Sequence, residues 1–105
     1  MLGELEQLVL LAVMRAGEDA YGVPVHREIQ RRTGRDLTLG TIYKTLSRLE
    51  EKRLLTSRLG DPTPERGGKA TRCYAVTAEG KRSLQATLRM LRKMAAGLDV
   101  GLEPT

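Results

Sequence analysis

The sequence predicts a mainly helical α+β domain that carries one small β-hairpin. Apolar residues recur at helical spacing through three segments in the first part of the chain and through one long segment near its end. Between them lie two short strand-like runs, separated by a segment too rich in proline and glycine for a helix or a strand. A length of 105 residues is enough for one small domain and too short for two.

The first helix is expected over residues 4–15, where apolar residues recur at the spacing of one helix face. Leu8 belongs to that face, and further apolar residues such as Leu11 widen it beyond one stripe. We therefore expect this helix to be covered on two sides, by its own core and by a partner surface such as the C-terminal helix. Gly17 supplies the helix stop.

A second helix is expected over residues 21–33, with Pro24 in its first turn, where the missing N–H costs nothing. Gly34 closes this helix. Three arginines lie on its outer surface, namely Arg27, Arg31 and Arg32. They are candidates for contacts with DNA phosphates, and a solvated helix face explains them equally well.

A third helix is expected over residues 39–52, after a short connector, and Thr38 is its expected N-cap. Ile42, Leu46 and Leu49 define its buried stripe. Two helices joined by a short connector, the second with a polar outer face, form the helix-turn-helix pattern.

In this pattern the first turns of the second helix enter the major groove of DNA. The residues expected at the DNA are Thr38, Gly40, Thr41, Tyr43, Lys44, Ser47 and Arg48. Side chains of these types can reach base edges or phosphates, and Gly40 would let the backbone approach closely. The alternative for Lys44 and Arg48 is a solvated helix face. For Tyr43 it is an aromatic position at the edge of the core.

Residues 54–59 and 70–76 are expected to form the two strands. Candidates for their inner face are Leu55 and Leu59 or Tyr74 and Val76. The loop between the strands is longer than a tight hairpin turn, so we expect it to form a wing that is mobile when free. Its second half and the second strand supply Arg66, Gly67, Gly68, Lys69 and Arg72. Such a wing can follow the phosphate backbone or place an arginine in the minor groove.

The last helix is expected over residues 78–98, with Thr77 as its cap. Its apolar residues follow one another at alternating spacings of four and three: Leu84, Leu88, Leu91, Ala95 and Leu98. This spacing is typical of paired helices, so we expect a dimer interface that also includes Leu8 and Leu11. The predicted organisation is a winged helix-turn-helix DNA-binding domain over residues 1–77, a dimerisation helix over residues 78–98 in the same compact unit and a flexible tail over residues 99–105.

The charge balance favours a polyanionic partner. The net charge is +5 and the pI is near 9.8, which does not by itself separate nucleic acid from an anionic membrane surface. No apolar run approaches the roughly 18 residues of a membrane span. Acidic Glu4 and Glu6 precede the first apolar stretch, so a secretory signal is not expected either. A single cysteine fits a reducing cytoplasm.

Enzymatic activity is not expected, because the sequence contains no recognisable acid–base pair, metal cluster or phosphate-cradling loop. One cysteine, Cys73, and one histidine, His26, cannot form an ordinary structural zinc site, so neither a metal nor a cofactor is predicted. Cys73 is expected to pack as a small strand residue. The alternative is a redox sensor, which would need an exposed thiolate.

Four segments carry a family resemblance, in the order GELEQLVLLAV, AYGVPVHREI, LGTIYKTLSRLEEKRLL and ERGGKATRCYAVTAEGKRSL. The chain resembles the PadR-like transcriptional regulators over most of residues 3–84. The single C-terminal helix is similar to the short subfamily, whose members dimerise through it. The resemblance implies a homodimer with two recognition helices, usually a repressor that acts on an inverted-repeat operator.

The resemblance also assigns residues. Thr41, Tyr43 and Lys44 fall on the G-T-x-Y-x segment that family members use at the DNA. The family's basic wing corresponds to Gly67, Gly68, Lys69 and Arg72. The chain departs from the family at two positions, where many members have proline in place of Lys44 and glycine in place of Arg53. Some relatives bind flat aromatic compounds between subunits, often against tryptophan; this chain has no tryptophan, so a small-molecule effector stays open.

Two alternatives stand beside a PadR-like regulator. A MarR-like winged helix would need longer helices on both sides of the DNA-binding core. A winged-helix protein-interaction module would bind an acidic protein through the same basic face. A gel shift with genomic fragments separates this last alternative from a regulator, because only a regulator retains DNA at low salt.

Overall fold

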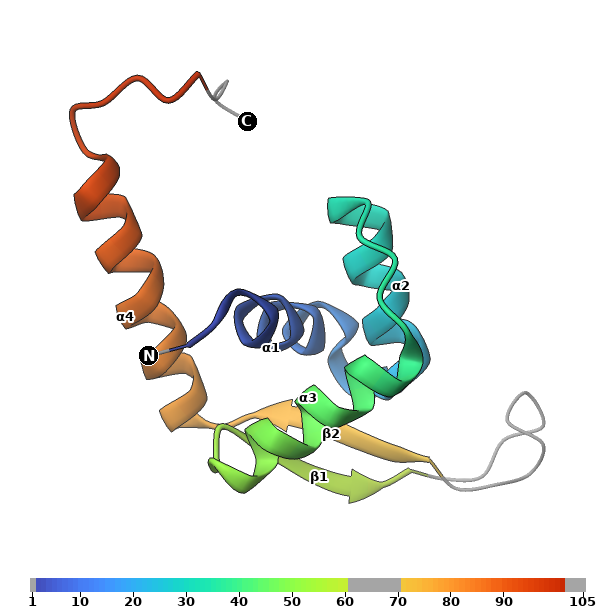
Figure 1. Ribbon diagram of the computed structural model, residues 1–105. Helices are drawn as coiled ribbons and strands as arrows, with labels where there is room; N and C mark the ends of the chain where they lie inside the picture. Colours follow the sequence, from blue (N-terminus) through green and yellow to red (C-terminus); the bar gives the residue numbers. More distant parts are fainter. Residues whose placement is uncertain (1, 61–70, 102–105) are drawn as a thin grey trace.

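Within residues 2–60 and 71–101, which the computed structural model describes, three helices surround one apolar core and a two-stranded antiparallel sheet packs against them (Figure 1). A fourth helix leaves this body at one end. The elements are α1 (Glu4–Ala16), the short 3-10 helix η1 (Gly17–Asp19), α2 (Gly22–Thr33), α3 (Leu39–Glu51), β1 (Leu55–Leu59), β2 (Arg72–Val76) and α4 (Ala78–Ala95). The predicted mainly helical α+β class with a small hairpin is confirmed.

One apolar stripe from each of α1, α2 and α3 meets at the centre of the molecule. The stripe of α3 is the predicted one, since Ile42, Leu46 and Leu49 are each 0% exposed. Burying a side chain of this size stabilises a fold by about 1.5–3 kcal/mol. Its partners on α1 and α2 are Val9, Leu10, Ala12, Val13, Val25 and Ile29. The opposite face of α3 is therefore turned outward.

The helix ends follow local sequence signals. The Thr38 hydroxyl accepts a hydrogen bond from the Thr41 N–H at 3.1 Å and caps α3 as predicted. The Thr77 hydroxyl accepts from the Gly80 N–H at 3.0 Å and caps α4 in the same way. Gly34 ends α2 in the left-handed conformation, with a φ of 75°. These predicted caps are confirmed, because a cap depends on a few neighbouring residues.

The two strands pair antiparallel along their full length. Leu55 and Tyr74 are buried in the core, whereas Leu59 is 64% exposed. The expectation of an inner-face Leu59 is therefore wrong. This residue lies at the end of β1, opposite exposed Arg72 and past the buried part of the sheet. The second strand begins at Arg72, and residue 70, which was expected to begin it, lies outside the described residues.

Helix α4 crosses the end of the sheet very closely at Gly80. A Cβ atom at this position would lie 2.3 Å from the Leu54 carbonyl oxygen and 2.8 Å from Val76 Cγ1. Only a hydrogen atom fits here, so the crossing requires glycine. The same Leu54 carbonyl accepts a hydrogen bond from the Thr77 N–H at 3.1 Å, which holds the chain where it enters α4.

Two residues of the predicted dimer seam are placed differently from the prediction. Leu84 is 4% exposed and belongs to the chain's own core, so its side chain is not available to a second chain. Helix α4 ends at Ala95 and not at residue 98, because Ala96 is extended and Gly97 takes a φ of 80°. Leu98 therefore lies past the end of the helix. The seam residues that remain exposed on α4 are Leu88, Leu91 and Ala95.

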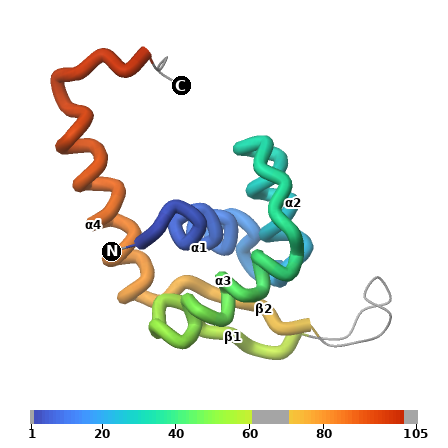
Figure 2. The backbone as a smooth tube through the Cα atoms, viewed as in Figure 1, coloured from blue at the N-terminus to red at the C-terminus, as the bar shows by residue number. Residues whose placement is uncertain are grey.

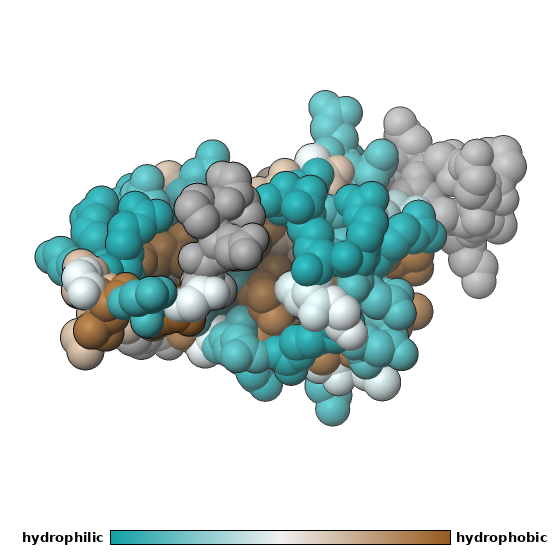
Figure 3. Space-filling view, turned by 90° about the horizontal axis from the view of Figure 1, so that it is seen from above, coloured by the Kyte–Doolittle hydropathy of each residue, from teal (hydrophilic) through white to brown (hydrophobic). Residues whose placement is uncertain are grey.

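The C-terminal half of α4 extends away from the other helices (Figure 2). Leu91 is 50% exposed and Met94 is 75% exposed on this half. Seen from above, apolar side chains gather at the end of the molecule formed by α4 (Figure 3). No helix in the described part of the chain is long and apolar enough to cross a membrane.

The turn between α3 and β1 holds Arg53 at a φ of 63°, a left-handed conformation that favours glycine. Within the described residues it is the only non-glycine residue with a positive φ. The Arg53 N–H donates to the Glu50 carbonyl at 2.9 Å, and the Thr77 hydroxyl donates to the Arg53 carbonyl at 2.8 Å. The surrounding structure therefore holds a strained conformation at one of the two positions where the sequence departs from the family pattern.

Replacing Arg53 by glycine should stabilise the protein. A non-glycine residue in a rarely occupied backbone region costs about 1–3 kcal/mol, and the greater freedom of glycine in the unfolded chain offsets part of the gain. We expect Arg53→Gly to raise the free energy of unfolding by about 0.5–1 kcal/mol in urea titrations. Arg53→Ala is the matched control, because it removes the charge and keeps the strain. Equal gains in both variants would contradict the strain argument.

Candidate nucleic-acid interface

The outer face of α3 gathers most of the predicted recognition residues into one surface. Tyr43, Lys44, Ser47, Arg48 and Glu51 line a shallow depression there, which we call the recognition surface. All five are exposed, while the stripe on the opposite side of the helix is buried. Glu51 is missing from the prediction, although its place four residues after Ser47 puts it on the same face. Its carboxylate could accept a hydrogen bond from the amino group of cytosine.

The first turn of α3 carries the other predicted residues of this helix. The hydroxyl of Thr38 donates to that of Thr41 at 2.9 Å. A Cβ atom on exposed Gly40 would lie 3.9 Å from Thr38 Oγ1, an ordinary contact, so the fold itself does not require glycine at this position. Close approach of a DNA backbone at Gly40 stays a prediction.

Tyr43 lies at the edge of the recognition surface, next to the start of α2. The residue is 42% exposed. Its ring packs directly over Gly22, where an added Cβ atom would lie 2.4 Å from Tyr43 Cζ. The sequence left two interpretations of Tyr43 open, an exposed recognition residue and an aromatic residue at the edge of the core. Both describe it, because the ring packs on α2 while the residue stays partly exposed.

Arg72 connects the wing strands to the end of α3. Its Nη1 donates to the Ser57 hydroxyl at 2.9 Å, and that hydroxyl donates to Glu50 Oε2 at 2.6 Å. Arg72 is exposed, and the remaining N–H groups of its guanidinium can serve an outside acceptor. Burial, followed by the charge of Glu50, raises the pKa of Tyr74 beneath this network. The other predicted wing residues, Arg66, Gly67, Gly68 and Lys69, lie outside the described residues.

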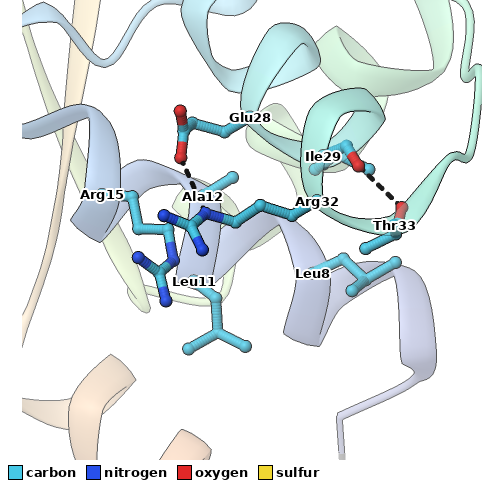
Figure 4. Close-up of a pocket in the computed structure, with 8 residues that line it drawn as sticks. All are labelled: Leu8, Leu11, Ala12, Arg15, Glu28, Ile29, Arg32 and Thr33. Atoms are coloured by element: carbon cyan, nitrogen blue, oxygen red, sulfur yellow. Dashed lines mark hydrogen bonds and ion pairs between the residues drawn. The ribbon is translucent and has the colours of Figure 1, made fainter. Parts of the chain in front are cut away.

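The predicted phosphate-binding arginines of α2 lie in different surroundings. Arg31 and Arg32 both pair with Glu28, with Arg32 Nε 3.2 Å from Glu28 Oε1. Arg32 also borders a groove of about 200 Å³ between α1 and α2 (Figure 4). The groove is lined by Leu8, Leu11, Ala12, Arg15, Glu28, Ile29, Arg32 and Thr33. It shares no residue with the recognition surface. Arg27 is exposed.

Among the described residues there is neither a cluster of potential metal ligands nor an exposed cysteine. Within residues 2–60 and 71–101, no three His, Cys, Asp or Glu side chains come close enough together to hold a metal ion. Cys73 is 6% exposed, with its Sγ 3.8 Å from the Thr71 carbonyl oxygen. It packs as a small strand residue, as predicted.

The sequence as a whole decides the family. The family model described as "Transcriptional regulator PadR-like family" matches residues 10–86, from α1 into α4. The chain belongs to this family. An uncharacterised protein of Lysinibacillus sphaericus is 27% identical to this PadR-like chain over 103 residues, which is 96% of this chain and 90% of that protein.

Solved structures of PadR family regulators share the fold. A PadR family transcription regulator from Clostridium difficile R20291 gives a TM-score of 0.70 at 27% identity, and the match covers 89% of this chain and 95% of that one. A PadR family transcriptional regulator from Eggerthella lenta DSM 2243 gives a TM-score of 0.69 at 27% identity, over 90% of this chain and 81% of that one. Membership of the PadR-like family supports a DNA-binding transcription regulator and speaks against the MarR-like alternative.

An ion pair behind the recognition surface ties α3 of this PadR-like chain to α1. Lys52 Nζ lies 2.7 Å from Glu6 Oε2, and Glu6 is 8% exposed. The other carboxylate oxygen accepts a hydrogen bond from the Gly3 N–H at 3.1 Å. Burial raises the pKa of Glu6, but these two hydrogen bonds and the charges of Lys52 and Arg48 outweigh it. The pKa of Glu6 therefore lies below its ordinary value of 4.5.

Lys52→Met should reduce stability at neutral pH and lose this effect in acid. Because the folded-state pKa of Glu6 is lowered, its stabilising contribution is fully present above the ordinary value of 4.5 and is lost as the pH falls through the folded-state value. We expect a cost of about 1 kcal/mol at neutral pH, since the lysine is half exposed. Thermal melts followed by circular dichroism from neutral to acidic pH measure the difference.

The control for this pH series is Lys81→Met, which removes a charge from an exposed position on α4. Its melting temperature should differ from that of the native chain by a small amount that does not change with pH. A difference between Lys52→Met and the native chain that stays constant from neutral to acidic pH would contradict the assignment to Glu6.

Proposed function

We propose that this chain is a transcriptional repressor that binds an inverted-repeat operator as a homodimer. The observation that carries the proposal is the recognition surface, whose five side chains are all exposed on a helix that is fixed in the core from its other side. The net charge of +5 favours a polyanion. A helix of this kind fits the major groove of duplex DNA, where polar side chains meet the base edges.

Base contacts and phosphate contacts are assigned to different residues. Lys44 and Arg48 are assigned to bases, because their positions on α3 lie away from its buried stripe. Arg72 is assigned to a phosphate, because it is exposed on a wing strand and Ser57 holds its guanidinium. In this division phosphate contacts supply most of the affinity and base contacts supply the sequence preference.

The proposed second copy pairs through α4. Leu88 is 37% exposed and Leu91 is 50% exposed, one helical turn apart. Contiguous exposed apolar surface of this kind marks an interaction site. Half-buried Leu8 and Leu11 on α1 line the groove in Figure 4 and would extend the interface.

DNA selected from a random pool should contain an inverted repeat with half-sites about one helical turn, ~10 base pairs, apart. Lys44→Ala should reduce the preference for the selected sequence by about 1–3 kcal/mol. Arg72→Ala should weaken binding to selected and random DNA alike and reduce the slope of log affinity against log salt by about one. Fluorescence anisotropy over a salt series measures both quantities.

Equal losses on selected and random DNA for both variants would contradict this division of roles. A native chain that retains no DNA at low salt would remove the regulator proposal itself. The winged-helix module that binds an acidic protein through the same basic face would then be the better account.

Leu91→Glu should convert the dimer into a folded monomer. Leu91 is half exposed in the single chain, so its replacement leaves the core intact. In the proposed interface, by contrast, a buried unpaired carboxylate costs several kcal/mol. Sedimentation velocity at micromolar concentration measures the oligomeric state. Gln85→Glu adds the same charge on an exposed part of α4 outside the seam and should stay dimeric. A native chain that sediments as a monomer, or a dimeric Leu91→Glu, would rule out this interface.

A further inference from the structure

We propose that Gly22 is a positioning residue for DNA binding. Because Gly22 carries no side chain, the Tyr43 ring can pack directly on the first turn of α2. We call this position of the ring its seat, and it directs the hydroxyl to a phosphate of the DNA. The inference rests on the proposed DNA-binding function. It assigns Tyr43 to the DNA backbone and not to a base.

Gly22 and the Tyr43 ring are in direct contact. A Cβ atom on Gly22 would meet three atoms of the ring system, Cζ at 2.4 Å, Oη at 2.5 Å and Cε1 at 2.8 Å. Carbon atoms in ordinary contact lie about 3.5–4.0 Å apart, so only a hydrogen atom fits between this backbone and the ring. The φ of Gly22 lies outside the left-handed region. The position therefore needs glycine for the space that it leaves and not for its backbone conformation.

The seat determines where Tyr43 points. The backbone of α3 is fixed at its start by the Thr38 cap and inside the core by Ile42, which directly precedes Tyr43. With the backbone fixed, the contact with Gly22 holds the hydroxyl end of the ring against the start of α2, while the residue as a whole stays 42% exposed. Tyr43 therefore lies on the side of the recognition surface that borders α2.

A position beside α2 suits a phosphate contact. When a helix-turn-helix binds DNA, the second helix occupies the major groove and the first helix crosses the backbone. A hydroxyl held at the start of the first helix lies where the DNA backbone passes, and a phenol O–H can donate to a phosphate oxygen. A ring that packs against α2 cannot extend into the groove as the longer side chains of Lys44 and Arg48 can.

The seat can be tested without DNA. In the native chain, nuclear Overhauser cross-peaks should connect the Gly22 α-protons with the Tyr43 ring protons. In Gly22→Ala the ring must move, because the new methyl group occupies its place, and the cross-peaks from residue 22 to this ring should change. A native chain without these cross-peaks would overturn the inference and leave the proposed function standing.

Gly22→Ala should displace the ring without unfolding the protein, since the atoms in the way are the free end of a half-exposed side chain. Affinity for the selected operator and for random DNA should fall alike, by about tenfold, which corresponds to one hydrogen bond to a charged group. Tyr43→Phe keeps the ring and removes the hydroxyl, so it should produce the same loss. In the Tyr43→Phe background, Gly22→Ala should weaken binding by less than about twofold.

Gly3→Ala is the matched control, because its new Cβ atom would lie 3.9 Å from Glu6 Oε1, an ordinary contact. It should bind DNA as the native chain does. If the two losses of DNA affinity multiply in the double variant, the role of Gly22 is overturned. Native affinity in Tyr43→Phe would overturn it as well, even where Gly22→Ala fails to fold. A native chain that binds no DNA would overturn the proposed function and the inference with it.

Discussion

The burial of one side of α3 between α1 and α2 is the constraint on which the other features depend. Ile42, Leu46 and Leu49 have no exposed surface. A rotation of α3 by one residue would turn the helix by about 100° and would bring polar side chains into the core. The outward direction of the recognition surface is therefore fixed by apolar packing. Substitution of the charged residues on this surface would therefore leave the orientation of α3 unchanged.

Polar contacts at the two ends of α3 attach it to the elements around it. Thr38 closes its start, while the Lys52–Glu6 pair joins its end to α1. The Glu50–Ser57–Arg72 network joins the same end to both strands. The wing strands and the recognition surface are therefore parts of one rigid unit. A contact made by Arg72 and a contact made by α3 have a fixed spatial relation, which is what reading a groove and its flanking phosphates requires.

Local patterns in the sequence were enough to predict the helices, their caps and most of the recognition surface, because a helix face or a cap depends on neighbours within a turn or two. The predictions that failed concern which surface a residue of a regular pattern faces: its own core, another chain or solvent. Leu84 and Leu88 have the same helical spacing, and spacing cannot tell whether a residue faces its own core or another chain. Leu59 continues the alternation of its strand past the point where the body covers the sheet. The contact of Gly22 with Tyr43 joins distant residues and has no periodic signal.

The close crossing of α4 and the sheet at Gly80 bears on the half-site spacing that the proposed dimer can recognise. At that point the backbone of α4 touches the Leu54 carbonyl with no side chain between them, so the direction of α4 relative to the body is set by backbone contact and not by a flexible linker. In the proposed dimer that direction sets the distance between the two recognition surfaces. An operator lengthened by one base pair moves a half-site by about 3.4 Å and also rotates it around the duplex. Because the direction of α4 is fixed, the free-energy cost of binding such an operator would come from deforming the DNA.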